Sequence, residues 1–304
     1  MSVKVTGIAV YNASHVTGEL SQALLATITA IHPRPWLVTS ATSLDWSDEI
    51  LYIIVCPATE NTMPLPKHYI VYQLEPTVVL ERPAYQQLLR GAQAVWDYSL
   101  HNVTYLAQCG ITAIHVPVGY HPSTSTEDII SGQRSYSDAE KDVDVLFLGY
   151  DVHPRRKTIK EQLYLKGLRI WFVCGMGLTE MQAAIKRAKI CLNIHALDGM
   201  SCLETVRLSV LLSNQACVLS EDFAELKDDT IAQYSSSVLF TSYDSLVDRC
   251  VELTNNFDLR RQMAHQGYQW YLQRTWSKIV PFNELLPNLS PPSDPDSTGS
   301  AKLL

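Results

Sequence analysis

The sequence predicts an α/β protein of two domains, each built around a parallel sheet, and three observations lead to this prediction. The chain has 304 residues, about twice the roughly 150 residues of a common domain. Short apolar runs alternate with amphipathic helical patterns along most of the chain, as is typical of strands that helices cover on both faces. A polar stretch rich in serine and threonine interrupts this alternation near the middle and is the best linker candidate.

These observations divide the chain into four segments. We expect an N-terminal domain over residues 1–121, a linker over 122–141 and a C-terminal domain over 142–286, with the two domains facing each other across a cleft. Residues 287–304 are rich in proline and serine, a composition that predicts a disordered tail.

In the first half, apolar runs predict strands and amphipathic stretches predict helices. Strands are expected over residues 3–10, 36–39, 50–56, 69–74, 94–98 and 111–117. Helices are expected over residues 18–30, 83–91 and 99–110. The helix over 83–91 has proline in its first turn and ends at a glycine, and Ser99 is suited to cap the helix that follows.

The same pattern restarts more regularly in the second half. Strands are expected over residues 143–148, 168–174, 190–195, 216–220 and 237–240. Helices are expected over residues 155–166, 179–189, 201–213, 244–253 and 259–274, with Thr179, Ser201 and Asp244 as possible N-caps.

The charge balance bears on the class of partner. Lys and Arg number 24 while Asp and Glu number 31, so the formal net charge is −7. A chain without a basic excess is poorly suited to neutralise the phosphates of a nucleic acid. We therefore expect no nucleic-acid partner, although a local basic site for a small anion remains compatible with this charge.

No apolar run reaches the roughly 18 residues that span a bilayer, and the N-terminal residues lack the apolar region of a signal peptide. We therefore expect a cytoplasmic protein without stable membrane insertion. The seven cysteines are odd in number and contain no C-x-x-C pair. This pattern favours reduced thiols over a disulfide framework or a zinc site.

Ligands of parallel α/β sheets bind beyond the carboxyl ends of the strands, so the loops that follow strands are the places to look. After the strand over 143–148 comes Gly149, and then Arg155 and Arg156 at the start of a helix. Cations at that end oppose the helix dipole. A bound diphosphate, held by the helix N-terminus and the guanidinium groups, explains them; the alternative is a solvated first turn.

Two further loops in the second half are informative. Gly175 begins a G-x-G after its strand, which lets a ligand approach the backbone, but the third glycine of a dinucleotide fingerprint is missing and a plain tight turn is an equal alternative. Asn193 and His195 end the next strand two positions apart, so their side chains share a face. The loop after them contains three residues whose backbone amides would face an anion: Gly199, Met200 and Ser201.

Glu204 and Arg207 lie three positions apart in the helix that this loop enters. One interpretation is an intrahelical ion pair at the surface. The apolar residues that follow directly, at 210–212, favour instead a charged pair that points into a cleft. There the Glu204 carboxylate is suited to accept hydrogen bonds from ribose hydroxyls.

The first half offers three candidate bases. Glu75 and Asp97 follow predicted strands, where a carboxylate facing a cleft can take a proton. His15 lies in the loop after the first strand. The alternatives are an ordinary loop carboxylate for Glu75, a helix-capping role near Ser99 for Asp97, and an unremarkable surface residue for His15.

Together these segments resemble the GT-B glycosyltransferases, in particular the small family-1-type enzymes of bacteria and large DNA viruses (glycosyl transferases group 1). The matching segments lie between residues 70 and 221, about half of the chain. They are residues 70–75, 95–99 with Asn102, 115–122, 144–149 with Arg155 and Arg156, 192–195, and 204–207 continuing to 218–221.

The resemblance implies two Rossmann-like domains, with a nucleotide-sugar in the C-terminal one and a glycan or glycoconjugate acceptor at the N-terminal one. It implies that Arg155 or Arg156 neutralises the leaving diphosphate and that Glu204 holds the ribose. The last helix of such folds often crosses back to the N-terminal domain, which suits the aromatic segment around Trp270. The expected activity is hexosyl or pentosyl transfer.

Two departures from the family pattern matter. Many retaining members carry two glutamates eight positions apart. The second of them corresponds to Glu204, and eight positions before Glu204 stands Ala196, which leaves inversion or retention open. No D-x-D metal motif stands at a strand end, so we expect no metal and no cofactor beyond the nucleotide-sugar. The alternatives are a non-catalytic nucleotide- or sugar-binding protein on the same fold and, last, an NAD-dependent oxidoreductase, which would need a G-x-G-x-x-G after its first strand.

Overall fold

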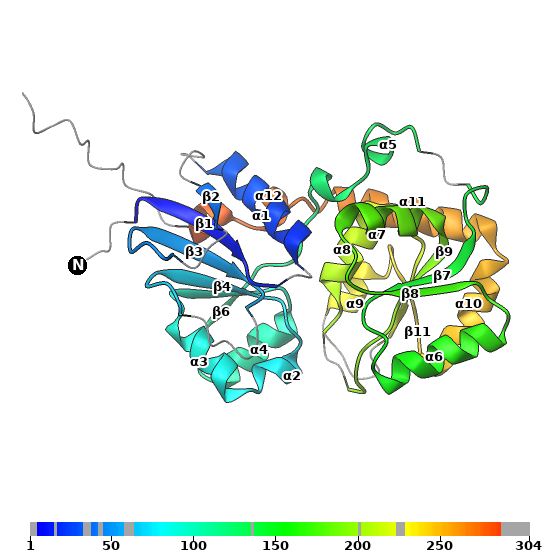
Figure 1. Cartoon of the computed structure of the whole chain (residues 1–304), viewed down its shortest axis with the longest axis horizontal. Helices are drawn as coiled ribbons and strands as arrows, with labels where there is room; N and C mark the ends of the chain where they lie inside the picture. The colour runs from blue at the N-terminus through cyan, green and yellow to red at the C-terminus, as the bar shows by residue number, and fades with distance from the viewer. Residues whose placement is uncertain are drawn as a thin grey trace, which may run out of the picture.

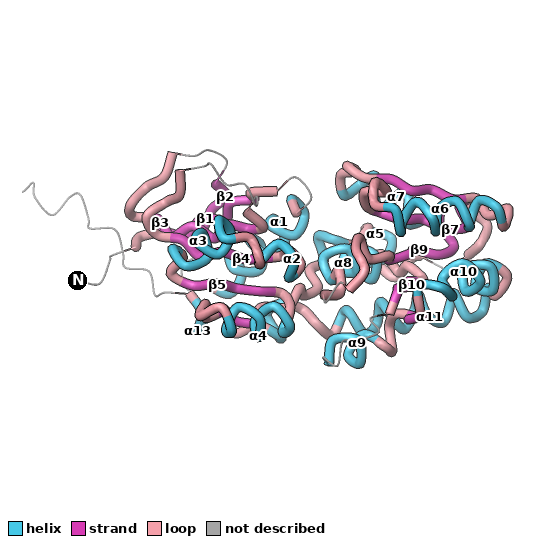
Figure 2. Tube along the Cα trace, turned by 90° about the horizontal axis from the view of Figure 1, so that it is seen from below, coloured by secondary structure: helices cyan, strands magenta, loops and turns pink. Residues whose placement is uncertain are grey.

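The structure, a computed structural model, contains two α/β domains that lie side by side (Figures 1 and 2). It describes residues 5–14, 17–32, 38–41, 45–57, 64–134, 137–199, 202–222 and 229–286. Each domain is built around a sheet in which all strands that pair are parallel. The predicted fold class is confirmed. His15, Met200, Ser201 and the tail over 287–304 lie outside the described residues.

The N-terminal sheet has six strands in the order β2-β1-β3-β4-β5-β6. They are β1 Gly7–Asn12, β2 Val38–Ala41, β3 Ile50–Val55, β4 Tyr69–Gln73, β5 Ala94–Asp97 and β6 Ala113–His115. The helices are α1 Gly18–Ile31, α2 Thr77–Leu80, α3 Pro83–Gly91 and α4 Leu100–Gln108. Helix α1 covers one face, and α2, α3 and α4 cover the other (Figure 1). Strands buried on both faces explain the continuous apolar runs.

The C-terminal sheet has five strands in the order β11-β10-β9-β7-β8. They are β7 Val143–Leu148, β8 Ile170–Val173, β9 Ala188–Asn193, β10 Val218–Glu221 and β11 Leu239–Thr241. The helices are α6 Pro154–Leu165, α7 Leu178–Arg187, α8 Thr205–Ser213, α9 Asp229–Tyr234, α10 Leu246–Thr254 and α11 Phe257–Leu272. Helices α7, α8 and α11 pack on one face, while α6 and α10 pack on the other.

The polar stretch between the sheets packs against the C-terminal domain. It contains a 3-10 turn, η2 Pro122–Thr124, and a short helix, α5 Glu127–Ile130. Asn214 Nδ2 donates to the Thr124 carbonyl at 2.8 Å, and Ser125 Oγ donates to the Ser213 carbonyl at 2.8 Å. Hydroxyl and amide side chains therefore satisfy backbone groups that would otherwise be buried without partners.

The chain returns to the N-terminal domain after α11. Two short helices, α12 Trp276–Ile279 and α13 Phe282–Leu285, pack into the core of the first sheet. Trp276 Nε1 donates to the Pro117 carbonyl at 2.8 Å, and the Phe282 ring lies 5.6 Å from that of Trp96. Trp270 does not take part in this crossing, because it packs on Tyr234 within the C-terminal domain.

Some element boundaries differ from the prediction. The helix expected to start at Ser201 begins at Thr205, with Glu204 at its N-cap. The two residues before Glu204, Cys202 and Leu203, are 2% and 3% exposed, so packing rather than helical hydrogen bonding holds this part of the loop. Similarly, α7 is capped by Gly177 rather than Thr179. Among the described helices, none combines the length and the apolar character needed to cross a bilayer.

Candidate functional site

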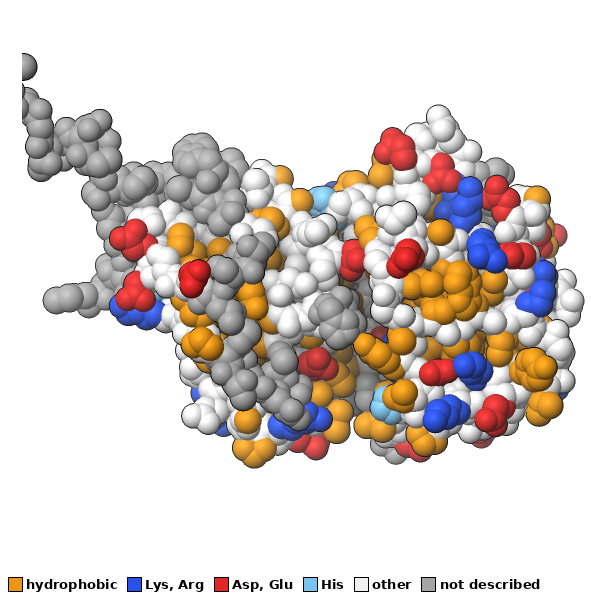
Figure 3. Space-filling view, in the orientation of Figure 1, with side chains coloured by type: hydrophobic (Ala, Val, Ile, Leu, Met, Phe, Trp, Pro, Cys, Tyr) orange, Lys and Arg blue, Asp and Glu red, His pale blue; other side chains and the backbone are white. Residues whose placement is uncertain are grey.

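A cavity of about 530 Å³ lies between the two domains, at the carboxyl ends of both sheets. Its walls come from the loops after β4, β5, β7, β8 and β9 and from the ends of α1, α8 and α12. The boundary between the domains is hollowed on the face drawn in Figure 3. Of the residues expected to bind a donor, the cavity is lined by Gly149, Arg156, Gly175, Glu204 and Arg207.

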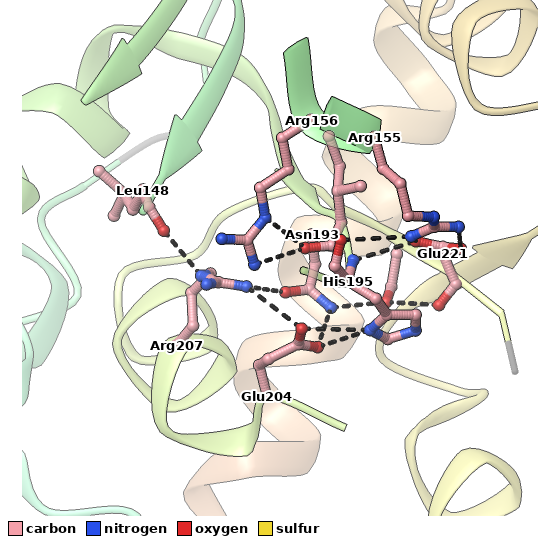
Figure 4. A network of polar contacts seen from close by, with 10 residues as sticks. Leu148, Arg155, Arg156, Asn193, His195, Glu204, Arg207 and Glu221 are labelled. Atoms are coloured by element: carbon pink, nitrogen blue, oxygen red, sulfur yellow. Dashed lines mark hydrogen bonds and ion pairs between the residues drawn. The ribbon is translucent and has the colours of Figure 1, made fainter. Parts of the chain in front are cut away.

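Glu204 lies at the N-cap of α8 and is held by side chains from β9 and the loop after it (Figure 4). Asn193 Nδ2 donates to Oε2 at 2.9 Å, and His195 Nδ1 lies 3.0 Å from the same oxygen. Burial opposes ionisation of this carboxyl, but His195, Arg207 and Asn193 outweigh burial and hold its pKa at about 2. Glu204 is therefore an ionised carboxylate that is held in a fixed orientation and lines the cavity.

Arg156 is 5% exposed, and its guanidinium is fixed by backbone carbonyls. Nε and Nη2 donate to Ile194 at 3.1 and 2.9 Å, and Nη1 donates to Tyr150 at 2.9 Å. Burial lowers the pKa of Arg156 to about 10, so the group stays protonated at neutral pH. Among the described residues no carboxylate forms an ion pair with it, so its charge is available to an anion.

Arg207 and Arg156 both place their guanidinium groups over the Phe147 ring. The two guanidinium carbons lie 5.1 and 5.0 Å from the ring centroid. Arg207 Nε donates to the Leu148 carbonyl at 2.7 Å, and Nη1 donates to Asn193. Burial lowers the pKa of Arg207 as well. One buried guanidinium group, one half-buried guanidinium group and one carboxylate leave an excess of positive charge, which a ligand of negative charge would offset.

Two glycines allow close approach at this wall. A Cβ on Gly149 would lie 3.1 Å from Arg207 Nη2 and 3.1 Å from the Phe147 ring, so a larger residue would require the guanidinium or the ring to shift by a few tenths of an ångström. Gly175 has φ +73°, in the left-handed region that favours glycine. Gly199 has positive φ too, but it does not line the cavity.

Arg155 takes a different place from its neighbour. It forms a two-point ion pair with Glu221, with Nη1 3.0 Å from Oε2. Its guanidinium also stacks over the Tyr243 ring at 4.1 Å and pairs with Asp198. Arg155 does not line the cavity, so of the two candidates for contact with an anion the structure brings only Arg156 to it.

Asn193 and His195 stand behind the cavity wall rather than in it. Both are buried, at 0% and 3% exposure. Asn193 Nδ2 also donates to Ser220 Oγ at 3.0 Å, and the His195 backbone N–H donates to Glu221 Oε2 at 3.0 Å. They therefore position the Glu204 carboxylate.

Thr205 is a site residue that sequence reasoning missed. It is the first residue of α8, it lines the cavity, and its Oγ1 is buried without a hydrogen-bond partner among the described residues. The first turn of a helix also leaves backbone N–H groups without intrahelical partners and carries partial positive charge. The sequence predicted a helix that starts at Ser201, which placed Thr205 in the helix interior. No sequence signal marked Thr205 as the first residue of the helix.

None of the described candidate bases from the first half lines the cavity. Asp97 is fully buried and accepts from the Ser99 backbone N–H, Asn102 Nδ2 and Gln73 Nε2 at 2.8, 3.2 and 2.7 Å. Burial, opposed by these hydrogen bonds, raises its pKa to about 8. Glu75 is half-buried and accepts from Cys56 Sγ at 3.4 Å. The N-terminal domain instead presents Glu19 to the cavity.

The loop that precedes Glu204 is anchored in the N-terminal domain. Cys202 Sγ lies 3.1 Å from Asn102 Oδ1 and 3.4 Å from Ser99 Oγ. Asn102 Nδ2 in turn donates to Asp97 and, at 3.0 Å, to the Glu75 carbonyl. A buried polar network therefore joins the carboxyl edge of one sheet to the cavity wall of the other.

Two parallel-sheet α/β domains with a cavity between them are the fold of the GT-B glycosyltransferases. No family model matches the chain. The uncharacterized protein R358 of Acanthamoeba polyphaga mimivirus is 29% identical over 165 residues, which are 54% of this chain and 54% of that protein. The match thus spans about half the length of the curated relative.

Two solved structures illustrate the likeness. One is an alpha-glucosyltransferase in complex with UDP-glucose and DNA containing an abasic site, with a TM-score of 0.58, 11% identity, and coverage of 92% of this chain and 98% of that one. The other is Anabaena Alr3699/HepE in complex with UDP-glucose, with a TM-score of 0.57, 10% identity, and coverage of 92% and 100%. At these identities the likeness concerns the fold.

The expectation that nucleic acid is excluded as a partner was wrong. An alpha-glucosyltransferase with this fold binds DNA, so the fold is compatible with a nucleic-acid partner. The physical reason is that a net charge of −7 sums over the whole surface. Contact with phosphates depends only on the charges near the groove that receives them.

Proposed function

We propose that this protein is a glycosyltransferase that moves a sugar from a nucleoside diphosphate sugar, held against the C-terminal domain, to a hydroxyl acceptor that enters beside the N-terminal domain. The observation that carries the proposal is the convergence of Arg156, Arg207 and Glu204 on one cavity between the domains. We also propose a family-1-type ancestry, which fits the order of the sequence motifs.

The diphosphate would lie between the two guanidinium groups and the first turn of α8. As the anomeric bond breaks, negative charge grows on the leaving diphosphate, and fixed donors aimed at that charge lower the barrier. Arg156 and Arg207 supply full charges, while Thr205 Oγ1 and the helix N-terminus supply further donors. Because the protein provides these cations, we propose that transfer needs no metal, and activity should persist in EDTA.

The nucleoside would be held through its ribose by Glu204. An ionised carboxylate accepts hydrogen bonds through both oxygens, and the contacts from His195 and Asn193 leave its position fixed. We propose a uridine donor carrying a hexose, because compared proteins of this fold bind UDP-glucose.

Two acceptor classes follow from different observations. The sequence resemblance favours a glycan or glycoconjugate and a role in glycan biosynthesis, while the DNA-bound glucosyltransferase of this fold favours DNA. UDP release from UDP-glucose in the presence of oligosaccharides or of duplex DNA with hydroxymethylated bases separates the two. The expected cytoplasmic location stays a prediction.

Calorimetric titration with UDP tests the site. Arg156→Ala and Glu204→Gln should each weaken UDP binding at least about tenfold, the equivalent of about 1.4 kcal/mol. The matched controls Arg261→Ala and Glu252→Gln alter exposed side chains on α11 and α10 and should leave the affinity unchanged. Unaltered UDP affinity in both site variants would contradict the proposal. UDP binding without UDP release from UDP-glucose, whatever the acceptor, would favour the non-catalytic alternative.

A further inference from the structure

We propose that Glu19 is the catalytic base of the transfer, so that its carboxylate takes the proton of the attacking hydroxyl and the anomeric centre is inverted. This inference rests on the proposed function and adds to it both the residue that activates the acceptor and the stereochemical course.

Glu19 lies where an acceptor would meet the donor. It is in the first turn of α1, which follows β1 at the carboxyl edge of the N-terminal sheet, and it lines the cavity between the domains. In Figure 1 the N-terminal end of α1 faces the C-terminal domain. Among the described residues of the cavity wall only Glu19 and Glu204 carry carboxylates, and they come from opposite domains.

The two carboxylates differ in what surrounds them. Glu204 is held by His195, Asn193 and Arg207, so its ionised form is strongly stabilised and it is a poor proton acceptor. Glu19 is half-buried, and no hydrogen bond or ion pair joins its side chain to another described residue. The oxygens of Glu19 therefore keep their acceptor capacity for a substrate hydroxyl, which a general base requires.

The wall around Glu19 favours this role. The other residues that the N-terminal domain and α12 contribute to the cavity are mostly apolar, namely Leu20, Ala23, Leu74, Pro76, Tyr98 and Trp276. Among these described wall residues Glu19 is the carboxylate that can accept a proton from a bound hydroxyl.

The carboxylates expected from the sequence are less suited. The Asp97 carboxylate already accepts three hydrogen bonds from protein groups, and its side chain is fully buried outside the cavity. Glu75 is outside the cavity and accepts from Cys56. Neither residue lines the cavity where the two substrates would meet.

The step balances without any further reactant. The acceptor oxygen forms a bond to the anomeric carbon as its proton passes to a Glu19 oxygen. The bond between the anomeric carbon and the diphosphate oxygen breaks, and its electron pair leaves with the diphosphate beside Arg156 and Arg207. Attack from the face opposite the leaving group inverts the anomeric configuration.

The experiment measures UDP release from UDP-glucose with water as the nucleophile. Glu19→Gln keeps the shape of the side chain and should lower kcat by about 10²- to 10⁴-fold, while the Kd for UDP stays within about twofold. The pH dependence of kcat should lose its acidic limb in this variant. Glu81→Gln, a change at an exposed glutamate of the same domain, is the control and should retain the kcat of the unsubstituted protein.

Azide separates a catalytic role from a structural one, because azide attacks without losing a proton. In Glu19→Ala, added azide should restore UDP release and produce β-glucosyl azide from the α-linked donor. A Glu19→Gln variant with undiminished kcat, or an azide product of α configuration, would overturn the inference while leaving the proposed function intact. An unsubstituted protein that neither binds UDP nor releases it from UDP-glucose would overturn both.

Discussion

Replacement of Asn102 by alanine probes the network that joins the two domains. Asn102 is fully buried, and its side chain makes four hydrogen bonds. It donates to the Asp97 carboxyl and the Glu75 carbonyl, and it accepts from Thr77 Oγ1 and Cys202 Sγ, the last two at 2.8 and 3.1 Å. The variant therefore removes contacts within the N-terminal domain and one of the contacts that reach Cys202 in the loop before Glu204.

The size of the effect follows from these bonds. A typical hydrogen bond contributes about 1 kcal/mol net to the unfolding free energy, so the loss of four hydrogen bonds should lower it by about 4 kcal/mol. Asp97, the Glu75 carbonyl and Thr77 Oγ1 each retain a second partner, which reduces the expected loss to about 3 kcal/mol. Because the lost contact with Cys202 is between domains, UDP affinity should fall as well.

Urea unfolding followed by circular dichroism and by tryptophan fluorescence measures this loss. Two transitions in place of one would show that the domains have been uncoupled. Asn255→Ala, at an exposed position on the C-cap of α10, is the control and should change the unfolding free energy by less than about 0.5 kcal/mol. A loss below about 1 kcal/mol in Asn102→Ala, with unaltered UDP affinity, would refute this account of the network.

Three further predictions concern single side chains. Glu204 has a pKa of about 2 in the folded protein against an ordinary 4.5. Its contribution to the unfolding free energy, up to about 3 kcal/mol, should therefore be lost as pH drops from about 5 to 2. Urea unfolding at each pH should show this loss in the unsubstituted protein and not in Glu204→Gln. Trp276→Ala should lower the unfolding free energy by about 3–5 kcal/mol, measured in urea, because this buried ring fills the N-terminal core; a loss under about 1 kcal/mol would contradict that packing. Gly149→Ala should displace Arg207 and weaken UDP binding about tenfold in calorimetry, and full affinity would mean that the guanidinium is not needed there.

Much of the fold could be predicted from the order of residues because the physical signal is local. Continuous apolar runs are typical of strands covered on both faces, and the strand β7 and the helix α3 have the predicted bounds. The same logic leads to the carboxyl ends of the strands, where Glu204 and Arg156 lie in one cavity.

Only the tertiary structure decided which of the neighbouring side chains meet. Arg155 and Arg156 are adjacent on a helix, so their directions differ by about 100°, and the docking of α6 turns one to Glu221 and the other to the cavity. Contacts across the two domains place Cys202 beside Asn102 and Glu19 in the wall opposite Glu204. A sequence carries no short-range signal for contacts between residues a hundred or more positions apart, because their proximity depends on how whole sheets and helices pack.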